Sequence, residues 1–236
     1  RLKKIDSQGD TVIETPIPSQ VFRMATDPRG WVFLAEGNVT GRLFDADGNQ
    51  VWAIGGLAGE TTTSAAIDAG GNAYINYSNG QARKIGPDGN QVWLGRGRTS
   101  GLQGIAVDVT ENVYLVYTLG YAYQLDPSGN TVWGVQHGLD EGQDIAVDAT
   151  PFIYIARANG YVQKLDSSGG LVWQERPSTS TLNSIDVDQQ GNIYTSTTFI
   201  VYKLLSDGSL DWSYEPGVSS IVNISVDPNR FSLYLT

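Results

Sequence analysis

The sequence repeats itself about every 40 residues, and this period constrains the fold more than any other feature. Tryptophans mark it at intervals of 41, 40, 40 and 39 residues: Trp52, Trp93, Trp133, Trp173 and Trp212. Tyrosines recur at steps of 40: Tyr74, Tyr114, Tyr154, Tyr194 and Tyr234, with Phe33 one step earlier. Aspartates that end an apolar run share the register: Asp27, Asp68, Asp108, Asp148, Asp188 and Asp227. A fixed period of this length is typical of solenoids and propellers.

Each period predicts four short strands, A to D, joined by tight turns. In the third repeat they are expected at Gln103–Asp108, Asn112–Tyr117, Tyr121–Asp126 and Thr131–Val135, which are short runs of β-branched and aromatic residues. The turn between strands C and D carries Asp-x-x-Gly, in which glycine supplies positive φ and the aspartate side chain caps the turn. No segment keeps a helical period over three turns, so we expect no helix.

Four antiparallel strands in each 40-residue unit predict an all-β fold, a six-bladed β-propeller. The chain opens with a C and a D strand and closes with an A and a B strand, so we expect one domain, 1–236, whose last blade is shared between 1–15 and 220–236. Pairing of these terminal strands would close the ring and cover two sheet edges. The alternative is a fragment of a ring with seven or eight blades.

Composition narrows the classes of partner. The net charge of −10 argues against nucleic acid and anionic membrane surfaces, because a phosphate-binding surface should be basic. The chain has no cysteine, which rules out disulfides, thiol catalysis and cysteine–zinc sites. No apolar run approaches the roughly 18 residues of a membrane span. Nothing at the start looks like a signal peptide, and because the chain begins with Arg1 we expect a processed or trimmed product.

Two parts of the repeat resemble known families. Gly104-Ile-Ala-Val-Asp108 with Asn112-Val-Tyr114 resembles the NHL and bacterial β-propeller repeat (SBBP-type) cassettes. Gly160 to Asp166, with Gly169 to Trp173, resembles the quinoprotein-type (PQQ-like) repeat, in which an outer-strand tryptophan docks against the next blade. The resemblance implies a bacterial or viral β-propeller repeat protein. The quinoprotein enzymes of that family form an eight-bladed ring with a calcium site, and this sequence shows neither eight repeats nor a calcium site.

The repeated residues are interpreted first as structural. The five tryptophans are expected to pack between blades, with sugar-stacking platforms as the alternative. The repeated Asp and Asn residues are interpreted as turn residues. Asp45-Ala-Asp47-Gly-Asn49 looks like part of a calcium loop but lacks the remaining ligands and the terminal Glu, so we expect no metal there.

Binding residues are expected where the repeat breaks, in the D–A and B–C loops on one face of the scaffold. The candidates are charged or titratable loop residues: Arg96, Arg98, His137, Asp140, Glu141, Arg157 and Arg176. His137 is the only histidine, so a Ser–His–Asp triad would have to include it, but no nucleophile is indicated. Arg96 and Arg98 could clamp a carboxylate, or they could belong to a flexible polar loop. A sialidase interpretation fails, because Asp126, Gly129 and Trp133 do not match the Asp-box spacing of that family.

The sequence therefore favours a non-enzymatic binding or assembly module without a cofactor. Its partner is expected to be a glycan, a peptide or another protein, in a secreted, cell-surface or virion protein that is part of a larger assembly. One alternative is a lyase or hydrolase in which His137, Asp140, Glu141, Arg96 and Arg98 converge at the channel mouth. Another is a purely structural repeat domain of a longer chain.

Overall fold

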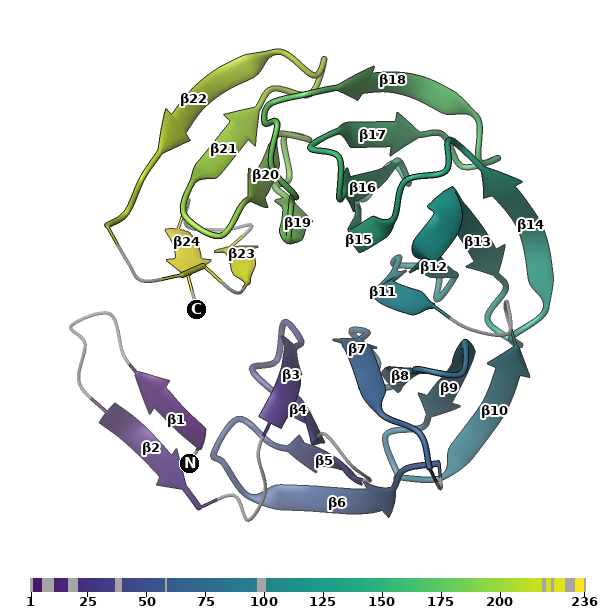
Figure 1. Cartoon of the computed structure of the whole chain (residues 1–236). Coiled ribbons are helices and arrows are strands. Elements are labelled where there is room, and N and C mark those ends of the chain that lie inside the picture. The colour runs from purple at the N-terminus through teal and green to yellow at the C-terminus, as the bar shows by residue number, and fades with distance from the viewer. Residues whose placement is uncertain are drawn as a thin grey trace. The chain divides into compact units, whose positions relative to one another are not determined.

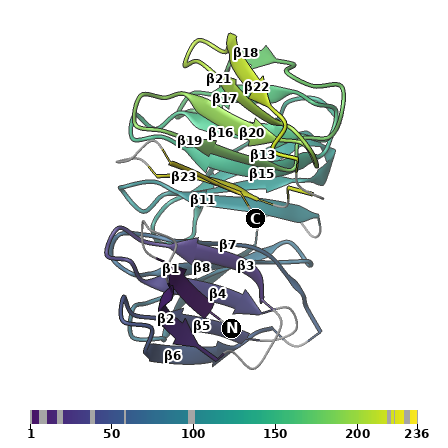
Figure 2. The same ribbon diagram turned by 90° about the vertical axis from the view of Figure 1, so that its left-hand side faces the viewer.

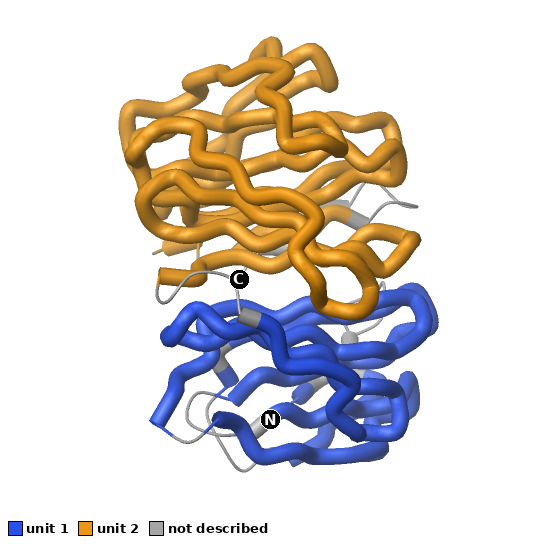
Figure 3. The backbone as a smooth tube through the Cα atoms, turned by 90° about the vertical axis from the view of Figure 1, so that its right-hand side faces the viewer, with its two compact units in different colours: residues 1–100 blue, residues 101–236 orange. Residues whose placement is uncertain are grey.

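The computed structural model describes residues 2–5, 11–16, 21–36, 40–57, 59–96, 101–217, 220–221, 223–227 and 232–235. These residues form an all-β structure of five four-stranded and two two-stranded antiparallel sheets (Figure 1). The one helical element among them is a single 3-10 turn, η1, at Thr118–Gly120. Two compact units divide the chain, Arg1–Ser100 and Gly101–Thr236 (Figure 3). The prediction of one domain over 1–236 stays a prediction.

Unit 1 holds one two-stranded sheet and two four-stranded sheets. The two-stranded sheet is β1 (Leu2–Ile5) with β2 (Thr11–Thr15). The next sheet is β3 (Val21–Thr26), β4 (Val32–Glu36), β5 (Thr40–Phe44) and β6 (Gln50–Gly55). The last is β7 (Thr62–Ile67), β8 (Ala73–Tyr77), β9 (Gln81–Ile85) and β10 (Gln91–Arg96).

Unit 2 holds three four-stranded sheets and one two-stranded sheet. The first is β11 (Leu102–Val107), β12 (Val113–Tyr117), β13 (Tyr121–Leu125) and β14 (Thr131–Gln136). The second is β15 (Gly142–Val147), β16 (Ile153–Arg157), β17 (Val162–Leu165) and β18 (Leu171–Glu175). The third is β19 (Ser184–Val187), β20 (Ile193–Ser196), β21 (Val201–Leu204) and β22 (Leu210–Tyr214), and the two-stranded sheet is β23 (Ile224–Asp227) with β24 (Ser232–Leu235).

In each four-stranded sheet the strands follow one another in chain order, as the repeat predicts for a blade. Within unit 2 the first strands β11, β15, β19 and β23 lie beside one another, and β14, β18 and β22 lie farthest from them (Figures 1 and 2). Every residue of β12 and β16 is buried, and each of these strands lies between two others in its sheet. That burial explains their continuous apolar runs.

An aspartate and a tyrosine hold the turn between strands A and B in four of the five four-stranded sheets. The Asp108 carboxylate accepts hydrogen bonds from the Thr110 and Asn112 backbone N–H groups, and Tyr114 donates its hydroxyl to it at 2.9 Å. These hydrogen bonds hold the pKa of Asp108 below its usual value despite partial burial. Burial and the Asp108 charge together raise the pKa of Tyr114. The same aspartate–tyrosine bond occurs at Asp68, Asp148 and Asp188, which explains why the two markers share one period.

Outer-strand tryptophans connect neighbouring sheets within each unit. Trp133 donates its indole N–H to the Ser167 carbonyl at 2.9 Å, and Trp52 donates to the Pro87 carbonyl at 3.1 Å. The rings lie against the last glycine of the C–D turn in the next sheet, where a β-carbon added to Gly169 would lie 3.1 Å from Trp133. These turns therefore need glycine both for positive φ and for space.

Hydrogen bonds also join neighbouring first strands, one period apart. Asp144 accepts from the Ile185 backbone N–H at 3.0 Å, and Asp186 accepts from the Val226 backbone N–H at 2.8 Å. The Ser184 hydroxyl lies within hydrogen-bond distance of both Asp144 and Asn223. Sheets within unit 2 are thus connected at their first and last strands.

Candidate functional site

The B–C turns and D–A loops lie at the same end of each sheet, because all four strands are antiparallel. In unit 2 this end carries the turns 118–120 and 158–160 and the loops 137–141 and 176–183. Five of the predicted ligand-binding residues lie in or beside these segments: His137, Asp140, Glu141, Arg157 and Arg176.

Arg157, at the end of β16, is buried in the middle of this region and is 2% exposed. Its Nε donates to Gln163 Oε1 at 2.6 Å, and its Nη1 donates to the Asp140 carbonyl at 2.8 Å. Nη2 is also buried and has no partner among the described atoms. Burial lowers the pKa of the Arg157 guanidinium to about 10, against the opposing effect of the Asp140 charge. Arg157 is therefore still a cation at neutral pH, and it fixes the loop above it.

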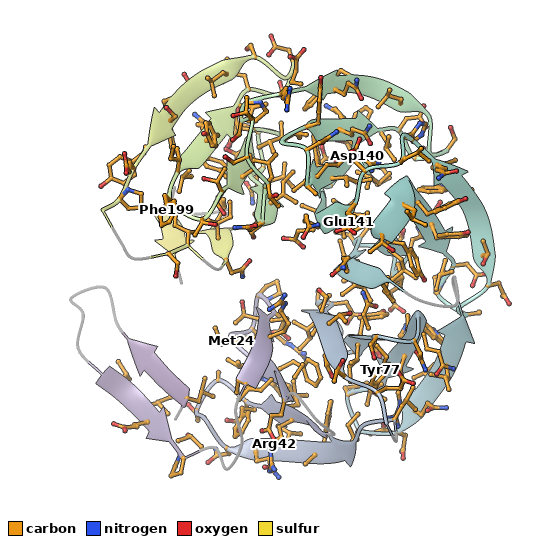
Figure 4. All side chains as sticks on the ribbon, in the orientation of Figure 1. Met24, Arg42, Tyr77, Asp140, Glu141 and Phe199 are labelled. Atoms are coloured by element: carbon orange, nitrogen blue, oxygen red, sulfur yellow. The ribbon has the colours of Figure 1, made fainter. Side chains whose placement is uncertain are left out.

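Asp140 and Glu141 hold that loop against the next turn (Figure 4). The Asp140 carboxylate accepts from the Asn159 side-chain amide at 2.7 Å, and the Glu141 carbonyl accepts from the Ala158 backbone N–H at 2.9 Å. Both acidic side chains are exposed. Two adjacent carboxylates thus face solvent from a loop whose backbone is held by Arg157 and Ala158.

Arg176 holds the same turn from its other side. Its Nε donates to the Asn159 carbonyl at 3.1 Å, and its guanidinium lies 5.3 Å from the centre of the Tyr161 ring. The Thr181 hydroxyl donates to the Ala158 carbonyl at 3.0 Å. The structure therefore brings Asp140, Arg157 and Arg176 together around one turn, 158–160.

The His137 side chain is not part of the cluster around the turn 158–160, because it is directed at a different turn. Its Nε2 is 2.8 Å from the Gly169 carbonyl, in the C–D turn of the next sheet, so Nε2 carries the hydrogen of this bond. Its backbone N–H donates to the Gly120 carbonyl at 3.1 Å. Arg96 ends β10, but its side chain lies outside the described residues, as does all of Arg98. The convergence that a hydrolase or lyase would need stays untested.

One recurring feature was not expected from the sequence. The residue that ends strand B contacts the residue six positions later in strand C, and we call these two residues the corner pair of a sheet. Glu36 and Arg42 form an ion pair at 2.8 Å, and Arg157 bonds to Gln163. Tyr117 and Tyr123 make an edge contact, with ring centres 5.5 Å apart. The i, i+6 spacing was present in the sequence, but the residue types differ from sheet to sheet.

Turn geometry accounts for the Asp45–Asn49 segment. Asp45 Oδ1 accepts from the backbone N–H groups of Asp47 and Asn49, and Oδ2 accepts from the Asn49 side-chain amide at 3.1 Å. These bonds lower the pKa of Asp45. Within the described ranges no group of three or more His, Cys, Asp or Glu side chains is placed to hold a metal. The same residues include no helix long and apolar enough to cross a membrane.

Comparisons with known proteins agree with the architecture. A sequence family described as "Outer membrane protein assembly factor BamB", of the PQQ-like repeat type, matches residues 119–231, just under half of the chain. A search of curated protein sequences finds no match. Among solved structures, a chain in "Crystal Structure of Mitotic Checkpoint Complex" is similar with a TM-score of 0.81 at 12% identity, over 92% of this chain and 69% of that one.

The fold and these comparisons define the chain as a β-propeller repeat protein. At 12% identity the solved structure supports the fold alone. The PQQ-like character expected from Gly160 to Trp173 agrees with the family match, which covers those residues.

Proposed function

We propose that this protein is a non-enzymatic binding or assembly module that presents its B–C turns and D–A loops to a partner. The observation that carries the proposal is the cluster around the turn 158–160. Arg157, Asn159 and Arg176 each donate a hydrogen bond that holds two of these segments together, while Asp140 and Glu141 remain exposed above them. Rigidly held loops with exposed polar groups suit recognition, because binding then costs little ordering entropy.

The proposed architecture is a closed ring of six blades, in which β23 and β24 supply strands A and B and β1 and β2 supply strands C and D of one blade. Ile13 of β2 occupies the place of the repeated tryptophan and packs toward Gly48, and Thr15 donates to the Gly48 carbonyl at 2.9 Å. The β1–β2 sheet therefore meets its successor as a complete blade does.

Residue pairing between strands B and C gives a second argument for six blades. Tyr74 is opposite Lys84, Tyr154 is opposite Lys164, and each ammonium group lies 5.2–5.4 Å from the centre of the tyrosine ring. Tyr194 and Lys203 repeat this arrangement. By the same count along the sequence, Tyr234 would be opposite Lys4. The terminal strands thus carry the residue types of one ordinary blade.

The proposed partner is a glycan, a peptide or another protein, in a secreted, cell-surface or virion setting. The matching family is described as an assembly factor, which supports a role in assembly. A thermal-shift panel of mono- and oligosaccharides, with calcium or with EDTA, tests the glycan branch. A ligand at about 100 times its Kd adds roughly 2.7 kcal/mol. That should raise the Tm by roughly 5–10 °C for a chain of this size. A flat panel would leave a peptide or protein partner.

A further inference from the structure

The turn 118–120 and the loop 137–141 of unit 2 contact each other, and each carries exposed residues. Gln136 Nε2 donates to the Leu119 carbonyl at 2.8 Å, and the His137 backbone N–H donates to the Gly120 carbonyl at 3.1 Å. Gly120 has no room for a β-carbon, because the Gly138 carbonyl oxygen occupies that position. The two segments therefore touch backbone to backbone. We call Leu119, Leu139, Asp140 and Glu141 the Leu119–Leu139 surface.

Two leucines on this surface project into solvent without a structural reason. Leu119 is 56% exposed and Leu139 is 76% exposed. Leu119 also has φ of +61°, a left-handed conformation that costs a leucine on the order of 1–2 kcal/mol. Asn79 and Asn159 occupy the equivalent turn position one period away on either side. Neither asparagine has positive φ, so the left-handed conformation is particular to the turn 118–120, and no feature of the repeat accounts for a leucine there.

The charges beside these leucines are negative. Asp140 and Glu141 are exposed, and each has one described side-chain hydrogen bond, to Asn159 at 2.7 Å and to Gln143 at 3.4 Å. The cation beneath them, Arg157, is buried and is directed at the Asp140 carbonyl. An approaching partner therefore meets aliphatic groups next to two carboxylates.

We propose that the Leu119–Leu139 surface binds a peptide segment in which a large apolar side chain lies within two residues of a lysine or arginine. The apolar side chain covers the leucines, and the cation pairs with Asp140 or Glu141. Aliphatic anchors favour a peptide over a glycan, since sugars are recognised by stacking on aromatic rings. This inference rests on the proposed binding function and names its partner class.

A phage-displayed library of random dodecapeptides, selected on the immobilised full chain, tests the proposal. Enriched peptides are then synthesised, and their Kd values are measured by fluorescence polarisation against four variants: Leu119→Asn, Leu139→Ser, Asp140→Asn with Glu141→Gln, and Val109→Ser. Val109 is the matched control, because it is an equally aliphatic residue, 82% exposed, in the A–B turn at the opposite end of the same sheet. Leu119→Asn should fold at least as well as the parent, since asparagine tolerates positive φ.

We expect the selected peptides to share an apolar residue near Lys or Arg. Their affinity for Leu119→Asn and for Leu139→Ser should be lower than their affinity for the parent by about tenfold or more. Affinity for the charge variant should fall and lose most of its salt dependence. Val109→Ser should bind as the parent does. Peptides that bind all variants equally would overturn the surface and leave the binding module intact. Failure to enrich any peptide would overturn the peptide proposal. If, in addition, no saccharide raises the Tm in the thermal-shift panel, the two results together would count against the binding module itself.

Discussion

A disulfide between the two ends of the chain tests whether β1 and β24 are neighbours in one blade. In complete sheets, Ile155 of strand B is opposite Gln163 of strand C, one position beyond the tyrosine–lysine pair. If β24 and β1 pair as strands B and C of one blade, the same register would place Leu235 opposite Lys3. Directly opposed residues in antiparallel strands have Cα atoms roughly 4.5–5.5 Å apart. That separation suits a disulfide, which spans about 4.4–6.8 Å.

The double variant Lys3→Cys, Leu235→Cys should therefore oxidise to an intramolecular disulfide. The parent has no cysteine, so the engineered pair is the only one that can form. The bridge would close a loop of about 230 residues, for which chain entropy predicts a stabilisation of about 5 kcal/mol. At about 2–4 °C per kcal/mol, the Tm should rise by roughly 10–20 °C, and dithiothreitol should remove the gain.

Non-reducing electrophoresis, free-thiol titration and calorimetry with and without reductant measure this outcome. The control is Ile5→Cys, Leu235→Cys, which shifts one partner by two residues, or about 6.8 Å along the strand. Its Cα atoms would then be roughly 8 Å apart, beyond disulfide reach. Free thiols in the Lys3 variant, or equal bridging in both variants, would refute the pairing and favour a fragment of a larger ring.

Three further predictions concern the packing within and between sheets. Gly169→Ala should lower the free energy of unfolding by about 1–2 kcal/mol because of its positive φ, and by about 1–3 kcal/mol more because of the contact with the tryptophan ring. In Gly191→Ala the nearest neighbour of the new β-carbon would be 3.5 Å away, so only the loss from positive φ is expected. Equal losses for the two variants in urea denaturation would contradict close packing at Gly169. Tyr114→Phe should cost about 1.5–3 kcal/mol by chemical denaturation, against less than about 0.5 kcal/mol for Tyr214→Phe, which is 57% exposed. The lowered pKa of Asp108 predicts stability that is fully present above about pH 4 and lost as the pH falls further; the urea midpoint between pH 6 and pH 2.5 measures it, and Asp108→Asn should flatten that fall.

Strand positions were predictable because the repeat fixes them through local chemistry. Strand B of the third repeat was expected at 112–117 and is Val113–Tyr117, and strand D was expected at 131–135 and is Thr131–Gln136. The small differences fall at turn residues such as Asn112, whose side chain bonds to the preceding aspartate. The number of blades depends on whether the terminal strands β1 and β24 pair with each other, and no local pattern determines that.

The candidate site was predictable only in part. Asp140, Arg157 and Arg176 come together because their loops recur with the period at the same end of neighbouring sheets. His137 does not join them, because β14 carries it toward the turn of the next sheet. Leu119 and Leu139 do not stand out in the sequence, because an apolar loop residue carries no chemical signature of binding and the positive φ of Leu119 leaves no trace there.

Corner pairs have a consequence for how such a protein could diversify. The bonds between Glu36 and Arg42 and between Arg157 and Gln163 are each made within one sheet, by residues six positions apart. An exchange of Glu36 and Arg42 together would therefore break no described bond to a neighbouring sheet, whereas an exchange of Arg157 and Gln163 would also remove the bond to the Asp140 carbonyl in the loop that joins two sheets. If the turns bind a partner as proposed, a pair such as Glu36 and Arg42 could be replaced by two substitutions that change the chemistry beneath one turn and leave the other sheets as they are.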